Sequence, residues 1–146
     1  MREFEYFIKK GIVKKISVDK ARAENLIEEA NRKFKQFERI LKKVGVDNDN
    51  ANDFVEDSCD ILLGLIRAKM FLEGFSASGL GAHEAEVSFL YKLNFTEQEI
   101  DFVQKLRYFR NGIMYYGKKF DKEYAEKVIK FTKENFQKLK KILNLD

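Results

Sequence analysis

The chain has 146 residues, of which 45% are hydrophobic and 36% are charged. This length and balance are typical of one globular domain and exclude an intrinsically disordered chain. No apolar run approaches the roughly eighteen residues of a membrane span, and the N-terminus lacks the apolar stretch of a signal peptide. We therefore expect a cytoplasmic protein with no membrane contact and a single domain over residues 1–146.

The net charge of +4 is unevenly distributed along the chain. Residues 1–46 carry 13 basic and 7 acidic side chains, residues 47–117 carry 6 and 12, and residues 118–146 carry 9 and 5. Both ends are therefore basic and the middle is acidic. If the terminal helices lie together, they form a surface that attracts phosphates, although a solvated lysine-rich face is the commoner meaning of such counts.

The first two predicted elements are helical. Residues 3–16 have the pattern of a short amphipathic helix that is interrupted by its one glycine. Apolar residues then recur in steps of four and three from Ala23 to Val44, a spacing typical of a long helix packed against neighbours at shallow angles. Asp19 is a candidate N-terminal cap, and Gly45 can adopt the left-handed conformation that ends a helix.

A loop rich in Asn and Asp, residues 47–53, leads into a second long helix predicted over residues 54–73. The loop faintly resembles a calcium-binding loop but lacks the glycine at its sixth position and the glutamate at its twelfth, so we reject a calcium site. Within the helix, Gly64 allows a neighbouring helix to approach closely. A glycine-rich connector follows, and it lacks the Gly-Lys-Ser/Thr ending of a phosphate-binding loop.

The third predicted helix, residues 83–93, is short. His83, the only histidine, lies in its first turn, where a structural or capping role is more frequent than a catalytic one. Thr96 and Glu99 form a capping box that opens the fourth helix, and Asp121 is a candidate cap for the fifth. We find no strand pattern, so the sequence predicts an all-α, antiparallel up-and-down bundle of four to five helices.

The fourth helix ends in "LRYFRNGIMYYG", residues 106–117. A helical wheel places Tyr116 on the core face and Arg110 at its border. In the structural interpretation of this stretch, Arg110 pairs with an acidic residue of the second helix, Asn111 caps a turn, and Tyr115 and Tyr116 fill the end of the bundle. In the functional interpretation, these polar side chains line a binding site.

Metal and cofactor chemistry have little support in the sequence. The chain has one histidine and one cysteine, and it lacks the Glu-x-x-His pairs of di-iron bundles. Cys59 lies on an expected apolar helix face, where it is most simply a core residue. We predict neither a metal nor a cofactor.

The stretch "LRYFRNGIMYYG", the preceding "DILLGLIRAKMFLEGFSASGLGAHEAEVSFL" and the lysine-rich last helix together resemble the HEPN superfamily of small helical bundles. The resemblance covers about residues 19–143. Catalytic members of that superfamily are metal-independent endoribonucleases, usually dimers, whose motif is Arg, an often polar residue, a few intervening residues and then His. Arg110 and Asn111 match the first two positions, whereas the histidine position is Tyr115.

The resemblance thus implies a homodimer with Arg107, Arg110, Asn111, Tyr115 and Tyr116 as RNA- or nucleotide-binding candidates, the arginines for phosphate and the tyrosines for stacking. RNA cleavage needs proton transfers that histidine performs at neutral pH and tyrosine, with a typical pKa near 10, performs poorly as a base. We therefore expect a degenerate ribonuclease, weakly active or inactive. The alternatives are an active metal-independent endoribonuclease and a protein-interaction module that partners a minimal nucleotidyltransferase in a toxin–antitoxin-like pair.

Overall fold

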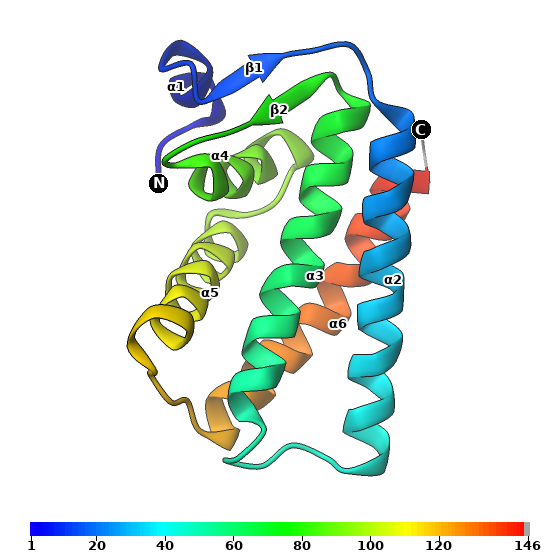
Figure 1. The fold of residues 1–146 in the computed structure, drawn as a ribbon, viewed down its shortest axis with the longest axis vertical. Helices are drawn as coiled ribbons and strands as arrows, with labels where there is room; N and C mark the ends of the chain where they lie inside the picture. Colours follow the sequence, from blue (N-terminus) through cyan, green and yellow to red (C-terminus); the bar gives the residue numbers. More distant parts are fainter. Residues whose placement is uncertain (145–146) are drawn as a thin grey trace.

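The structure, a computed structural model, describes residues 1–144 and confirms the all-α fold (Figure 1). Within these residues it contains six α-helices, one 3-10 helix and two short strands. In chain order they are α1 (Phe4–Lys9), β1 (Val13–Lys15), α2 (Lys20–Lys43), α3 (Ala51–Leu72), β2 (Phe75–Ala77), α4 (Ala82–Ser88), η1 (Phe89–Leu93), α5 (Glu97–Tyr116) and α6 (Lys122–Asn144).

Helix α3 is the centre of the bundle and packs against α2, α5 and α6 (Figure 1). Most of its side chains are buried, which explains why this segment is the most continuously apolar of the sequence. A Cβ added to Gly64 would lie 4.0 Å from the Cβ of Ala30, an ordinary van der Waals distance, so the packing of α2 against α3 does not depend on the glycine that was predicted to allow it. Stacked rings of Phe34 and Phe136, with centroids 3.8 Å apart, join α2 to α6.

The helix ends follow the predicted capping chemistry. The carboxylate of Asp19 accepts a hydrogen bond from the backbone N–H three residues later at 3.0 Å, and α2 begins directly after it. The Thr96 hydroxyl accepts from the Glu99 N–H at 3.1 Å, while the Glu99 carboxylate accepts from the Thr96 N–H at 2.9 Å. Asp121 accepts from the N–H of residue 124 at 2.9 Å. Local side-chain chemistry therefore decides where these helices start.

The two strands were not predicted. They pair antiparallel, with Val13 opposite Ala77 and Lys15 opposite Phe75. Each strand has only three residues, which is too short for an alternating pattern to be visible in the sequence. The pairing fastens the N-terminal segment to the connector between α3 and α4.

Other differences concern the ends of helices. Helix α3 begins at Ala51, three residues before the predicted start, and the predicted third helix changes to 3-10 geometry after Ser88. Val44 and Tyr116 were predicted to face the core but are 69% and 87% exposed. Both lie at the C-terminal ends of long helices, beyond the part of the helix that neighbours cover. A helical wheel places both side chains on the side of the helix that faces the core, but the core does not extend to the ends of these helices.

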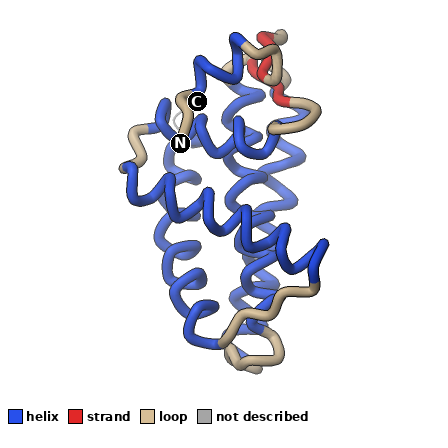
Figure 2. Tube along the Cα trace, turned by 90° about the vertical axis from the view of Figure 1, so that its left-hand side faces the viewer, coloured by secondary structure: helices blue, strands red, loops and turns tan. Residues whose placement is uncertain are grey.

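Helices α4 and α5 lie along one side of the α2–α3 pair. Figure 2, in which that side of the molecule faces the viewer, shows α5 running obliquely across α3 and α6. Among residues 1–144, no helix combines the length and apolar composition that crossing a bilayer requires.

Candidate functional site

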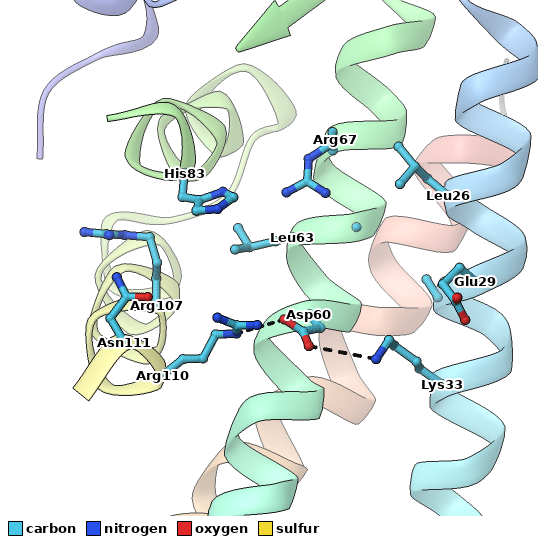
Figure 3. Close-up of a pocket in the computed structure, with 12 residues that line it drawn as sticks. Leu26, Glu29, Lys33, Asp60, Leu63, Arg67, His83, Arg107, Arg110 and Asn111 are labelled. Atoms are coloured by element: carbon cyan, nitrogen blue, oxygen red, sulfur yellow. Dashed lines mark hydrogen bonds and ion pairs between the residues drawn. The ribbon is translucent and has the colours of Figure 1, made fainter. Parts of the chain in front are cut away.

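A pocket of about 300 Å³ lies where α2, α3, α4 and α5 meet (Figure 3). Its titratable lining residues come from all four helices: Glu29 and Lys33 from α2, Asp60 and Arg67 from α3, His83 from α4, and Arg107 and Arg110 from α5. Excluding the histidine, the lining contains four basic residues and two acidic ones, and the buried Glu86 neutralises one of the four, Arg67, which leaves an excess of one positive charge. This is the environment that an anion requires.

Helix α5 contributes three pocket residues because of its periodicity. Arg107, Arg110 and Asn111 are three and four residues apart, which places them on one face of the helix. All three line the pocket. The side-chain amide of Asn111 has no hydrogen-bond partner within residues 1–144, so it does not cap a turn.

Arg110 is held by an acidic residue of α3. Its Nε donates to Oδ1 of Asp60 at 2.9 Å, and Oδ2 of Asp60 lies 3.9 Å from Nζ of Lys33 (Figure 3). A further nitrogen of Arg110 donates to the sulfur of Met114. The predicted pairing of Arg110 with an acidic residue of the second long helix is thus confirmed, and the guanidinium still lines the pocket.

Arg107 differs from the other two arginines of the pocket. Its Nε donates to the side-chain carbonyl of Gln104 at 3.1 Å, and within residues 1–144 it has no carboxylate partner. Its positive charge is therefore not neutralised by any described side chain. Of the pocket arginines, Arg107 is the one that can accept an anion without losing an ion pair.

The opposite wall contains a three-residue network. Glu86 is only 3% exposed and accepts two hydrogen bonds from Arg67, at 2.5 and 2.9 Å, in a bidentate pair. Nδ1 of His83 lies 2.9 Å from the Glu86 carboxylate. Burial raises the pKa of Glu86, but the hydrogen bonds from His83 and Arg67 outweigh it, so the pKa is lowered and the group stays ionised. The network fixes the direction of the imidazole.

The imidazole of His83 is accessible, because the side chain is 58% exposed. In Figure 3 it points from α4 toward Arg67. A second hollow of about 410 Å³ adjoins the pocket and shares His83, Arg107 and Asn111 with it. The rest of its wall comes from the loop before α4, including Leu80, which is 98% exposed, and from Ala82 and Glu84 of α4. The three shared residues therefore lie between two adjoining spaces.

Tyr115 and Tyr116 are not among the residues that line the pocket. Tyr115 is 72% exposed, and both side chains extend from the last turn of α5. The structural interpretation in which these tyrosines fill the end of the bundle is therefore wrong. As exposed rings next to the pocket-lining face of α5, they remain candidates for stacking.

No protein-family model, curated protein or solved structure matches the chain.

Five charged residues in or beside the pocket were missed in the sequence: Glu29, Lys33, Asp60, Arg67 and Glu86. The spacing of His83 and Glu86 offered a signal, because residues three apart on a helix lie side by side and a carboxylate there orients an imidazole. Arg67 offered none, since it is 19 positions from Glu86 and the pairing depends on how α4 packs against α3. Cys59, by contrast, is buried as predicted, and burial raises its pKa to about 12, so the thiol is not a nucleophile.

Proposed function

We propose that this chain is a HEPN-like protein that binds RNA, or a nucleotide, through phosphate contacts in the pocket between α2, α3, α4 and α5. The observation that carries the proposal is the unpaired charge of Arg107 within residues 1–144, in a pocket that two further arginines line. A guanidinium presents several N–H donors in a plane that matches phosphate geometry. Arg107 is the first contact, and Arg110 is the second.

The size and surroundings of the pocket support a nucleotide unit as the ligand. A space of about 300 Å³ is at the small end of ligand sites and is adequate for a phosphate with part of its sugar. The adjoining hollow gives a chain room to continue past Asn111, whose free amide can donate to or accept from a base or a ribose. The exposed Tyr115 supplies a ring on which a base can stack.

The test is binding of a fluorescently labelled single-stranded RNA, followed by anisotropy at about 0.15 M salt. Arg107→Ala should weaken binding about tenfold or more, because a hydrogen bond between charged groups contributes about 1.5–3 kcal/mol. Arg110→Ala should also weaken binding without unfolding the bundle, because its ion pair with Asp60 is partly exposed.

The matched control is Arg39→Ala. Arg39 is an exposed arginine of α2 that does not line the pocket, so its loss removes the same charge from the protein without changing the site. We expect a change of about twofold or less from this variant, because a single distant charge is screened by salt. Equal losses for Arg107→Ala and Arg39→Ala would refute a specific pocket.

A second candidate function is protein interaction, favoured by one observation. Near its C-terminal end α5 exposes large side chains at Tyr108, Met114, Tyr115 and Tyr116. Tyr108 and Tyr115 are seven residues apart and therefore share a face of the helix. Exposed aromatic residues of this kind are enriched at protein interfaces. A protein partner, such as the nucleotidyltransferase predicted from the resemblance, would co-purify with the wild type and not with a Tyr108→Ser, Tyr115→Ser variant.

A further inference from the structure

We infer that RNA binding in this pocket is controlled by pH, because protonation of His83 adds a positive charge to the walls of the two spaces that the ligand occupies. The inference rests on the proposed RNA binding and adds its regulation. His83 lines both the pocket and the adjoining hollow, and Figure 3 shows its imidazole pointing from α4 toward Arg67. Imidazole is the side chain that ordinarily gains or loses a charge between about pH 5 and 8.

One nitrogen of the imidazole is held and the other is available. An ionised carboxylate can only accept hydrogen bonds, so Nδ1 of His83, 2.9 Å from the Glu86 carboxylate, carries the proton of that contact. Nε2 has no hydrogen-bond partner within residues 1–144, and the side chain is 58% exposed. A proton that the ring takes up therefore goes to Nε2, where it creates a charge and a new N–H donor for an anion.

The wall around the imidazole can accommodate the charged ring without rearrangement. Glu86 is 3% exposed, and Arg67 donates to both of its oxygens, so the carboxylate stays in place beside Nδ1. The pair of Arg67 and Glu86 is complete without the histidine, since the arginine provides two hydrogen bonds. His83 is therefore free to change its charge while the packing of α4 against α3 is kept.

The charges around the imidazole are nearly balanced, so one added charge has a large effect. With Glu86 counted, the pocket has an excess of one positive charge, and Glu84 of the second hollow offsets it. The charged residues concerned are Glu29 and Lys33 of α2, Asp60 and Arg67 of α3, Glu84 and Glu86 of α4, and Arg107 and Arg110 of α5. Among residues 1–144, the other elements that pack against α4, which are α1, β2 and η1, contribute no charged residue to either space. Protonation of His83 thus changes the sum of these charges from zero to one positive charge.

The chain allows the effect of His83 to be separated from that of other groups. His83 is the only histidine, so no second imidazole changes its charge in the same pH range. Burial is the main reason that the pKa values of Glu56 and Asp57 are raised, but neither carboxyl lines the pocket or the hollow. Any pH dependence that these two carboxyls cause would remain after His83 is replaced.

The experiment measures the Kd of the full-length protein for a rhodamine-labelled oligouridylate of about ten nucleotides, by anisotropy at about 0.15 M salt and from about pH 5.5 to 8. A terminal phosphate has a second pKa near 6, so the RNA has none. The proteins are wild type, His83→Gln, which keeps the position neutral, and His83→Lys, which keeps it positive. Because His83 is largely exposed, both variants should fold, which circular dichroism checks at each pH.

Wild type should bind about fivefold more tightly at about pH 5.5 than at pH 8, the effect of one added charge that water partly screens. The Kd values of His83→Gln and His83→Lys should each change by less than about twofold over this range, and at pH 8 that of His83→Lys should be about fivefold lower. Gln36→Lys is the matched control, because it adds the same charge at an exposed position of α2 outside both spaces. Its gain in affinity should be smaller, since salt screens a distant charge.

Proton uptake provides a second measurement. If the protonated ring favours RNA, then RNA must by linkage favour the protonated ring. Calorimetric titrations near neutral pH, in two buffers with different ionisation enthalpies, measure the protons taken up on binding. Wild type should take up a fraction of a proton for each RNA bound, and both His83 variants should take up none. A histidine with only a structural role would not produce this difference.

Three results would overturn the inference and leave the proposed function standing: RNA binding by wild type with no pH dependence, a pH dependence that persists in His83→Gln, or equal Kd values for His83→Gln and His83→Lys at pH 8. Failure of wild type to bind RNA at any pH would instead overturn the proposed function, and the inference with it. The titrations at each pH therefore distinguish the two failures.

Discussion

Replacing Asp60 with Asn should tighten RNA binding, because the Asp60 carboxylate pairs with the Arg110 guanidinium and so competes with a phosphate for it. The carboxylate accepts from Nε of Arg110 at 2.9 Å and lies 3.9 Å from Nζ of Lys33, and both of these cations line the pocket. Asn has nearly the same shape and keeps an oxygen that can accept from Arg110. The substitution therefore removes a negative charge from the pocket while leaving its packing in place.

The size of the effect follows from the position of the pair. A phosphate charge about 6 Å from the Asp60 carboxylate is repelled by about 3 kcal/mol at an effective dielectric constant of 20, and by less where water has access. The side chains of Arg110 and Asp60 are 26% and 31% exposed, so part of this repulsion is screened. We expect about 1 kcal/mol, which corresponds to a roughly fivefold lower Kd. The cost to folding should not exceed about 1 kcal/mol, since partly exposed ion pairs contribute little.

Anisotropy titrations of the labelled RNA at about 0.05 and 0.15 M salt measure the change. The control is Asp53→Asn, an exposed residue of the same helix that does not line the pocket but carries the same charge. Asp60→Asn should gain more affinity than this control at both salt concentrations. Unchanged or weaker binding by Asp60→Asn would show that Arg110 does not contact the phosphate. Equal gains in affinity for Asp60→Asn and Asp53→Asn would show that only the net charge of the protein matters.

Two further predictions concern stability and assembly. Burial is the main reason that the pKa of Asp57 is raised, so its contribution to stability is complete below its unfolded value of 3.8 and is lost as the pH rises through the folded value. Asp57→Asn should therefore raise the free energy of unfolding at pH 7 but not at pH 3, and urea titrations that show a loss at pH 7 would contradict this. The homodimer predicted from the resemblance should appear in light scattering and dissociate in the Tyr108→Ser, Tyr115→Ser variant. Wild type that stays monomeric at high concentration would exclude it.

Much of the fold could be predicted because it depends on neighbours in the sequence. The capping box of Thr96 and Glu99 involves residues three apart, and the seam of α2 repeats every three or four residues. The strand pair could not be predicted in this way, because Val13 and Ala77 meet only when the chain has folded. The exposure of Tyr116 could not be predicted either, since a helical wheel gives the direction of a side chain but not the extent of the core.

The same distinction, between contacts of sequence neighbours and contacts made only on folding, applies to the site. Arg107, Arg110 and Asn111 could be predicted to lie together, because helical spacing places them on one face. The partner of Arg110 could be predicted only as an acidic residue of the second long helix, and Asp60 was identified by the packing of α5 against α3. Likewise, nothing in the sequence places His83 beside the arginines of a helix that begins fourteen residues later.

His83 and Tyr115 differ in their relation to the pocket, because His83 lines it and Tyr115 does not. Residues five apart on an α-helix differ by about 140° in direction, at 3.6 residues per turn. Position 115 is about 40° from Asn111 on the same helix, at the edge of the face that Arg107, Arg110 and Asn111 define, and its side chain is 72% exposed and does not line the pocket. His83 lines the pocket directly, and the buried Glu86 holds its ring. An imidazole therefore lines the pocket from α4, whereas position 115 lies outside the set of residues that line it.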